Sequence, residues 1–217
     1  MRPLPLKIDF HVHTCYSRDC STTLEEVVSY AKKKGLSGVA ITDHDTVEGA
    51  SRLLKKNSGI IVIPGIEVSS DQGHILGINV TTRIPPGLTA RETTDRIHEA
   101  GGIAIAAHPS TMFKSGIGLS GKVASYGLDA VEVINSALIP FFLLTCLNKR
   151  LATSIGLPQI AGSDSHIPET IGLAYTIVDN PEPEASIEDI VHAVKRGQIV
   201  PFGMPTPWRL RLEKIMR

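Results

Sequence analysis

The chain has 217 residues, of which 42% are hydrophobic, so it can bury a substantial core and suits a single domain. Lys plus Arg and Asp plus Glu each number 22, so no net positive charge favours nucleic acid as a partner. The longest apolar stretch, ALIPFFLLTCL (137–147), is too short to span a bilayer, and the three cysteines form no CxxC pair. We therefore expect a cytoplasmic protein with reduced thiols and no membrane partner.

Short apolar runs alternate with amphipathic stretches along the chain. Strands are predicted over 7–13, 37–44, 59–69, 74–80, 102–109, 128–135, 158–166 and 171–179. Helices are predicted over 23–35, 47–57, 88–101, 139–155 and 186–197. Thr23 followed by Glu26 predicts a capping box at the first helix.

Strands that are apolar on both faces and separated by helices favour a parallel sheet covered by helices. Six or seven such units in about 200 residues indicate a compact α/β fold of the β/α-barrel type, with an open doubly wound sheet as the alternative. We expect one domain over 1–217, with its motif-bearing core at about 7–200. The Pro-rich tail, about 201–217, either caps the barrel or presents Trp208 to a second subunit, and the oligomeric state is left open.

Polar side chains gather where the predicted strands end or begin. Six of the eight histidines lie at such positions, and His98 and His192 lie inside predicted helices. In a parallel barrel the carboxyl ends of the strands meet on one face, where active sites are built. The six histidines and the acidic residues beside them are His11, His13, Asp43, His44, Glu67, His74, His108, Asp164 and His166.

His11 and His13 are two residues apart on one predicted strand, so their side chains point to the same side. Two imidazoles arranged in this way can hold one Zn, Fe or Mn ion, and a carboxylate compensates its charge. A bridging carboxylate such as Glu67 would allow two ions to lie about 3.5–4 Å apart, as in two-metal hydrolases. Asp9 and Asp43 have supporting roles in this interpretation.

The order of the motifs DFHVHTCYS, ITDHDT, PGIEVS, GHILGI, AHP and AGSDSH resembles the PHP (polymerase and histidinol phosphatase) family over about residues 7–200. The resemblance implies a distorted (β/α)7 barrel with a trinuclear metal centre at the carboxyl ends of its strands. It implies a first ion held by His11, His13, Glu67 and Asp164. It also implies a second ion held by Glu67, His74 and His108, and a third by Asp19, His44 and His166.

This resemblance predicts two to three divalent ions (Zn, Mn or Fe) and hydrolysis of a phosphomonoester of a small metabolite or nucleotide by metal-activated hydroxide. Catalytic roles are predicted for Glu67, Asp164 and His166. Three residues near the motifs are candidates for binding the phosphate of this small substrate: Arg18, Lys114 and Asn135.

Three other functions are considered. An amidohydrolase also uses HxH in a barrel, but it would usually place a lysine where Glu67 stands. A nuclease acting on single strands is disfavoured by the neutral charge and by the absence of an aromatic stacking platform. A non-enzymatic module with a related barrel should lack the ligand set that this chain carries.

Overall fold

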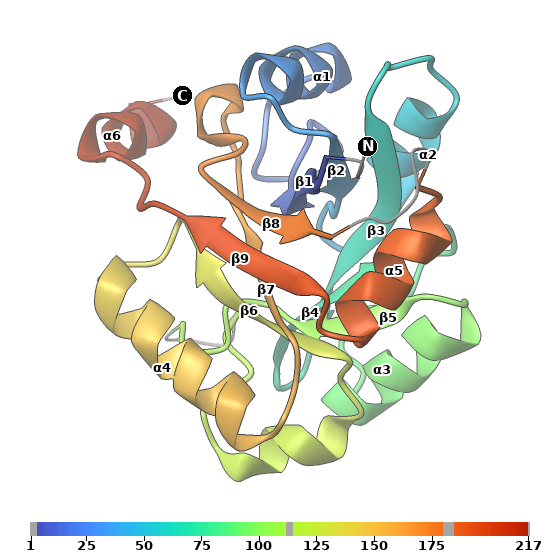
Figure 1. The fold of residues 1–217 in the computed structure, drawn as a ribbon, viewed down its shortest axis with the longest axis vertical. Helices are drawn as coiled ribbons and strands as arrows, with labels where there is room; N and C mark the ends of the chain where they lie inside the picture. The colour runs from blue at the N-terminus through green and yellow to red at the C-terminus, as the bar shows by residue number, and fades with distance from the viewer. Residues whose placement is uncertain (1–3, 112–114, 180–184, 217) are drawn as a thin grey trace.

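The computed structural model describes residues 4–111, 115–179 and 185–216, and Figure 1 shows its barrel-shaped sheet surrounded by helices. Within these residues nine strands form one sheet in the order β7-β6-β5-β4-β3-β2-β1-β8-β9. The strands are β1 (Leu6–Val12), β2 (Gly38–Ile41), β3 (Ile61–Ser70), β4 (Gly73–Ile78), β5 (Ile103–Ala106), β6 (Ala130–Asn135), β7 (Gln159–Gly162), β8 (Ala174–Val178) and β9 (Ile199–Gly203).

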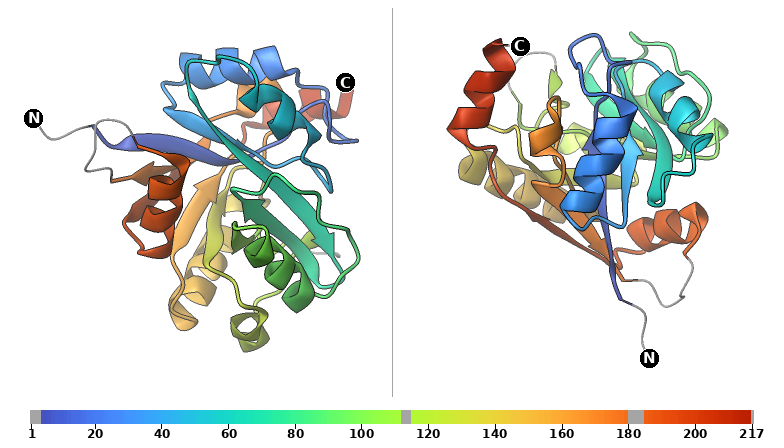
Figure 2. Two further views of the ribbon diagram at one scale, coloured as in Figure 1. Left: turned by 90° about the vertical axis from the view of Figure 1, so that its right-hand side faces the viewer. Right: turned by 90° about the horizontal axis from the view of Figure 1, so that it is seen from above.

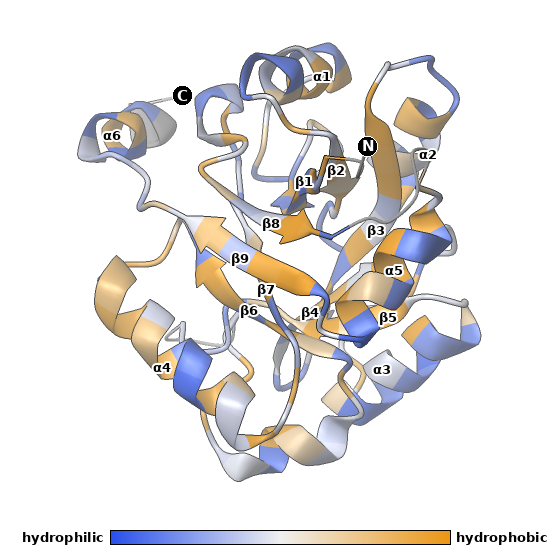
Figure 3. Ribbon diagram, viewed as in Figure 1, coloured by the Kyte–Doolittle hydropathy of each residue, from blue (hydrophilic) through white to orange (hydrophobic). Residues whose placement is uncertain are grey.

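The α-helices are α1 (Leu24–Lys33), α2 (Glu48–Leu54), α3 (Ala90–Glu99), α4 (Phe141–Ser154), α5 (Ile187–Lys195) and α6 (Trp208–Met216), and two 3₁₀ helices lie at Gly121–Tyr126 and Pro168–Thr170. Helices α1 to α5 bury apolar residues against the sheet, as the colouring in Figure 3 shows for α5. The capping box at α1 is confirmed, because Thr23 and Glu26 exchange hydrogen bonds between side chain and backbone. Within the described residues, no helix combines the length and hydrophobicity needed to cross a bilayer.

The sheet nearly closes into a barrel, which confirms the predicted α/β barrel class. β1, β2 and β3 run parallel to one another, as do β5, β6 and β7. Figure 2 shows how the sheet curves round. The seam between β1 and β7 is closed at one end by backbone hydrogen bonds from Asp164 N to His11 O (2.8 Å) and from His13 N to Ser165 O (3.1 Å). Lower in the barrel, β8 lies against β1, and the buried Thr176 hydroxyl accepts from Ala161 N at 2.8 Å.

Not every strand has the direction that we expected, because β4 and β8 run antiparallel to their neighbours. Only Asp71 and Gln72 separate β3 from β4, and a parallel pair would need a crossover of a dozen or more residues. The reversal places the start of β4 at the rim where β3 approaches its end. His74, the second residue of β4, therefore lies at the same rim as the strand ends.

The barrel interior has an apolar lower layer and a polar rim. One core cluster joins Phe10, Ile63 and Ile105 of the strands to Ile190 and Val194 of α5. A register shift interrupts the pairing of β1 with β2 between Asp9 and Val12, the stretch that contains His11.

The C-terminal segment packs back onto the domain instead of projecting from it. β9, which was not among the predicted strands, pairs antiparallel with β8, and α6 follows it (Figure 1). The Arg211 guanidinium fastens α6 by donating to the backbone oxygens of Ser136 (3.1 Å), Ala137 (2.8 Å) and Leu138 (3.3 Å). The tail is therefore fixed beside the loop that follows β6.

Candidate metal centre

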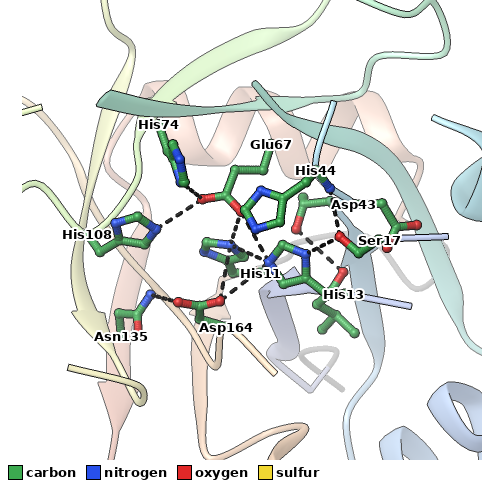
Figure 4. A network of polar contacts seen from close by, with 12 residues as sticks. His11, His13, Ser17, Asp43, His44, Glu67, His74, His108, Asn135 and Asp164 are labelled. Atoms are coloured by element: carbon green, nitrogen blue, oxygen red, sulfur yellow. Dashed lines mark hydrogen bonds and ion pairs between the residues drawn. The ribbon is translucent and has the colours of Figure 1, made fainter. Parts of the chain in front are cut away.

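The Glu67 carboxylate lies at the centre of a histidine cluster (Figure 4). It is buried at the rim, and its two oxygens face different groups. Oε1 is 2.9 Å from His74 Nδ1 and 3.0 Å from His108 Nε2. Oε2 is 3.2 Å from Nε2 of both His11 and His13, and 3.1 Å from His44 Nδ1. This geometry suits a carboxylate that bridges two ions.

Asp164, Asp19 and His166 complete the cluster. Asp164 Oδ1 is 3.7 Å from His11 Nε2 and 3.4 Å from His13 Nε2. Asp19 Oδ2 is 3.0 Å from His166 Nε2. Asp19 is 46% exposed, so this side of the cluster is open to solvent. The structure thus brings together all nine residues that were predicted as ligands: His11, His13, Asp19, His44, Glu67, His74, His108, Asp164 and His166.

Local backbone features direct several of these side chains into the cluster. His44 and Glu67 form an isolated parallel bridge, in which Glu67 N donates to Asp43 O at 3.1 Å. His108 and Asp164 have φ values of 29° and 53°. Residues other than glycine rarely adopt positive φ, and such strain concentrates at functional sites.

The donor set fits divalent cations. His11 Nδ1 donates to Glu132 Oε1 at 3.0 Å, and His166 Nδ1 donates to the Asp164 carbonyl at 3.1 Å. In a neutral imidazole with Nδ1 protonated, Nε2 carries a lone pair. These lone pairs face carboxylate oxygens. Both groups are hydrogen-bond acceptors, so a proton or a cation is needed between each nitrogen and its facing oxygen. The buried His44 Nδ1 has no aligned hydrogen-bond partner although Glu67 Oε2 is 3.1 Å away, as expected for two ligands aimed at one ion.

In the absence of ions, protons supply part of this positive charge. Burial opposes charge on His13, but the hydrogen bonds that it donates to Asp164 and Glu67 outweigh this effect and raise the His13 pKa to about 9. Burial likewise opposes charge on Glu67, but His11, His108 and His13 hold its pKa well below the usual range. The protonated histidines and the ionised carboxylates of the site therefore stabilise one another.

Four sets of three or four side chains within the cluster could each hold an ion, since the ligand atoms of each set lie within 4.8 Å of one another. These sets are His13, Asp19, His44 and His166; His11, Glu67 and His108; His11, His13 and Asp164; and His44, Glu67 and His74. They overlap the three sets implied by the sequence resemblance. They differ in that His13 also approaches the Asp19 set and His11 also approaches the His108 set.

Glu132 belongs to the site but was not predicted from the sequence. It is fully buried, and its second oxygen accepts from His108 N at 2.9 Å, while the first holds His11. A carboxylate that accepts from a ligating histidine fixes the tautomer and orientation of the ring. The available signal was a charged residue inside an apolar strand, AVEVIN, where only a paired carboxylate is tolerated.

The two aspartates predicted to support the ligands hold mainly backbone. Asp9 accepts from Ser163 N at 2.8 Å and Gly172 N at 2.9 Å, so it ties β1 to the loop that carries Asp164. Burial raises the pKa of Asp9 to about 6. Asp43 accepts from the backbone N and the hydroxyl of Thr14. Both therefore shape the segments from which the ligands project.

The three candidates for phosphate binding have different positions. Asn135 is buried, and its amide donates to Asp164 Oδ2 at 3.2 Å (Figure 4) and to Glu132 Oε2 at 3.0 Å, so it positions both carboxylates. Arg18 is exposed and is not among the described residues that line the cavity over the cluster. Lys114 lies outside the described residues.

A cavity of about 670 Å³ opens over the cluster. Its lining includes Asn135 and seven of the nine ligand candidates: Asp19, His44, Glu67, His74, His108, Asp164 and His166. The apolar part of the lining consists of Ala137, Leu138, Ile139, Pro140, Leu143 and Leu144. The cavity could therefore hold a ligand that has a charged group at the cluster and an apolar group against residues 137–144.

Comparisons with known proteins identify the family. An uncharacterized protein of Methanocaldococcus jannaschii is 36% identical over 143 residues, which cover 60% of this chain and 82% of that protein. The phosphoribosyl 1,2-cyclic phosphate 1,2-diphosphodiesterase of Eggerthella lenta is 41% identical over 85 residues, which span 36% of this chain but 32% of that protein. The family model described as PHP-associated matches residues 147–199. The chain belongs to the PHP family.

Solved structures share the PHP barrel at lower identity. A two-domain protein of Bacteroides vulgatus containing a predicted PHP-like metal-dependent phosphoesterase has a TM-score of 0.77 and 18% identity, covering 93% of this chain and 67% of that one. The lesion-specific endonuclease Q of Pyrococcus furiosus has a TM-score of 0.66 and 22% identity, covering 89% and 56%. At these identities the likeness concerns the fold. Because an endonuclease has this barrel, the expectation that nucleic acid is not a partner is unsupported.

Proposed function

We propose that this PHP protein is a metal-dependent phosphoesterase that hydrolyses phosphomonoesters of a small metabolite or nucleotide. The observation that carries the proposal is Glu67, a buried carboxylate whose two oxygens face separate histidine groups. The nine clustered residues are its proposed ligands for two to three ions of Zn, Mn or Fe. When bound, such ions neutralise charge on a phosphoryl group and make water a better nucleophile.

The chain's own residues prepare the site for this chemistry. Asp19, Glu67 and Asp164 balance the charge of the ions, and Glu132 holds His11 with its Nδ1 proton directed away from the cluster. Glu67, Asp164 and His166, which we propose as catalytic residues, all line the cavity, so a substrate there would touch them. Asn135 keeps Asp164 oriented through its Oδ2.

The cavity lining supports a substrate with one phosphoryl group. Among the described lining residues there is no Lys or Arg, so no fixed cation is available for a second phosphate away from the cluster. The apolar wall, formed by residues 137–140 and the first turn of α4, suits the organic part of an ester.

A phosphodiesterase acting on nucleic acid is the second candidate. The barrel shared with endonuclease Q supports action on nucleic acid. The Eggerthella relative supports diester cleavage only in general, because it is named for a small phosphoribosyl cyclic phosphate. The partly exposed Asp19 side of the cluster would leave room for a longer chain.

Release of phosphate by the metal-loaded protein tests the proposal. The panel contains phenyl phosphate, glycerol phosphate, nucleoside mono- and bisphosphates, a bis-aryl phosphodiester and a short single-stranded oligonucleotide. His44→Ala should abolish release, whereas His192→Ala, which changes an exposed histidine on α5, should not. Cleavage of the diester and the oligonucleotide alone would favour the second candidate, and no hydrolysis by a protein that still binds ions would refute both.

A further inference from the structure

A second cavity adjoins the one over the cluster. Its volume is about 310 Å³, and it shares four lining residues with the first: Ala137, Ile139, Asp164 and His166. Its remaining walls come from Ile167, Thr170, Thr206, Trp208, Leu210 and Arg211. A molecule bound at the cluster could therefore extend past Asp164 and His166 toward α6.

Trp208 is the residue of this cavity that most favours binding of a ligand. It is the single tryptophan of the chain, and it is 70% exposed at the start of α6. A large aromatic side chain left in water forfeits the free energy that its burial would provide. Ile139, which lines both cavities, is also 53% exposed, and an exposed apolar patch that borders a concave site marks a place of binding.

The ring of Trp208 is carried by a fixed segment. The Arg211 Cζ lies 5.6 Å from the Trp208 ring centroid, which is cation–π range, and the same guanidinium donates to the carbonyls of 136–138. Thr206 N also donates to Ser136 O at 2.9 Å. The ring is thus held relative to the loop that follows Asn135, and hence relative to Asp164.

We propose that this second cavity binds a planar aromatic group of the substrate, stacked on Trp208, while the phosphoryl group lies at the metal cluster. The substrate class is then an aromatic phosphomonoester, of which a nucleoside monophosphate is the simplest biological form. Ile139, Ile167 and Leu210 supply apolar contacts to the ring edges, and Thr170 and Thr206 offer hydroxyls to its polar atoms. This inference rests on the proposed phosphoesterase function.

Trp208 fluorescence tests the aromatic site without relying on catalysis. Adenosine, which has no phosphate to hydrolyse, is titrated into the full-length zinc-loaded protein, with glycerol as the control ligand. Stacking predicts saturable quenching by adenosine and none by glycerol. Because the chain has one tryptophan, excitation at the red edge of the absorption band, where its four tyrosines do not absorb, reports on this residue alone. A flat signal in both titrations would overturn the proposal.

Steady-state kinetics of Trp208→Leu provide the second test. Because the variant loses the stacking contact, KM for phenyl phosphate should rise roughly tenfold or more. KM for glycerol phosphate, and kcat for both esters, should stay near the wild-type values. Leu212→Ala, which removes a 59% exposed side chain from the same helix outside the cavity, should leave both esters unaffected.

Two results would contradict the aromatic site while leaving the phosphoesterase intact. One is an equal change in KM for phenyl and glycerol phosphate in Trp208→Leu. The other is a wild-type dimer in sedimentation that becomes a monomer in this variant, which would mean that a second copy of the chain covers Trp208. If wild-type protein hydrolysed neither ester but adenosine still quenched its fluorescence, the proposed function would fail and the aromatic site would stand.

Discussion

Glu132 Oε1 accepts a hydrogen bond from His11 Nδ1 at 3.0 Å, and both residues are fully buried in the wall of the barrel. The contact fixes which nitrogen of His11 faces Glu67. Glu132 therefore acts on the cluster through His11, as a positioning residue.

Replacing Glu132 by Gln should weaken metal binding without unfolding the protein. The amide keeps the shape of the side chain but removes the negative charge that orients His11 and raises its basicity. Loss of such a partner typically lowers metal affinity about 10- to 100-fold. Zinc affinity measured by chelator competition checks this, with the exposed Glu99→Gln as the matched control. Equal affinities in the two variants would show that Glu132 does not position His11.

Removal of the ions should lower thermal stability. A ligand present at 100 times its Kd stabilises the folded state by about 2.7 kcal/mol. For a protein of this size each kcal/mol corresponds to a Tm change of about 2–4 °C. Addition of a chelator should therefore lower Tm by several degrees, as measured by calorimetry. In Glu67→Gln the chelator should have little effect, since the bridging carboxylate is gone, and a full shift in that variant would exclude Glu67 as a ligand.

The metal-free protein should lose stability as pH rises. The pKa of His13 is raised in the folded state to about 9 from 6.5, so its contribution is complete below pH 6.5 and is lost as pH rises through about 9. Glu67 and Asp164 have lowered pKa values, so their contributions are lost only at acid pH. Urea unfolding at pH 6, 7.5 and 9 with chelator should show a falling free energy of unfolding.

Saturating zinc is the control for this pH series. A histidine that ligates an ion is neutral, so its contribution no longer depends on keeping a proton. The alkaline loss between pH 6.5 and 9 should therefore be much smaller with zinc than with chelator. Identical slopes under both conditions would mean that His13 does not exchange a proton for an ion.

Gly162→Ala should disturb the cluster by displacing His11 and Glu132. A Cβ at this position would lie 2.7 Å from Glu132 Oε1 and closer still to the Cβ of His11. The φ angle of Gly162 is not in the left-handed region, so the expected effect comes from steric overlap and not from backbone strain. Overpacking of this kind costs about 1–3 kcal/mol, and zinc affinity should fall as well. Gly121→Ala, where an added Cβ meets no atom within 4 Å, should match wild type in urea unfolding and zinc binding.

Much of the barrel could be predicted because its strands are short apolar runs that end in polar motifs. The convergence of His11, Glu67 and His108 follows from that placement, since strand ends of a barrel share one rim. Strand direction could not be read in the same way, because β4 is apolar whether it runs parallel or antiparallel. The two-residue connection Asp71–Gln72 was the decisive signal, and it lies between strands that were identified correctly.

Other parts depend on tertiary contacts that leave little trace in the sequence. Glu132 is a single carboxylate in an apolar strand, and only the fold shows that His11 is its partner. β9 contains Pro201 and has only a few residues, so its pairing with β8 outweighs a weak local preference. The attachment of α6 rests on Arg211 donating to backbone oxygens, which no residue pattern specifies.

The seam between β1 and β7 has a consequence for biosynthesis. The hydrogen bonds that close it join His11 and His13 to Asp164 and Ser165, so the last gap of the barrel and the metal cluster are completed by the same residues. A nascent chain that has emerged only as far as α4 already carries seven of the nine clustered side chains but lacks Asp164, His166 and the closing strand. On the proposed ligand set, loading of the full complement of ions therefore has to follow translation of the region around Asp164.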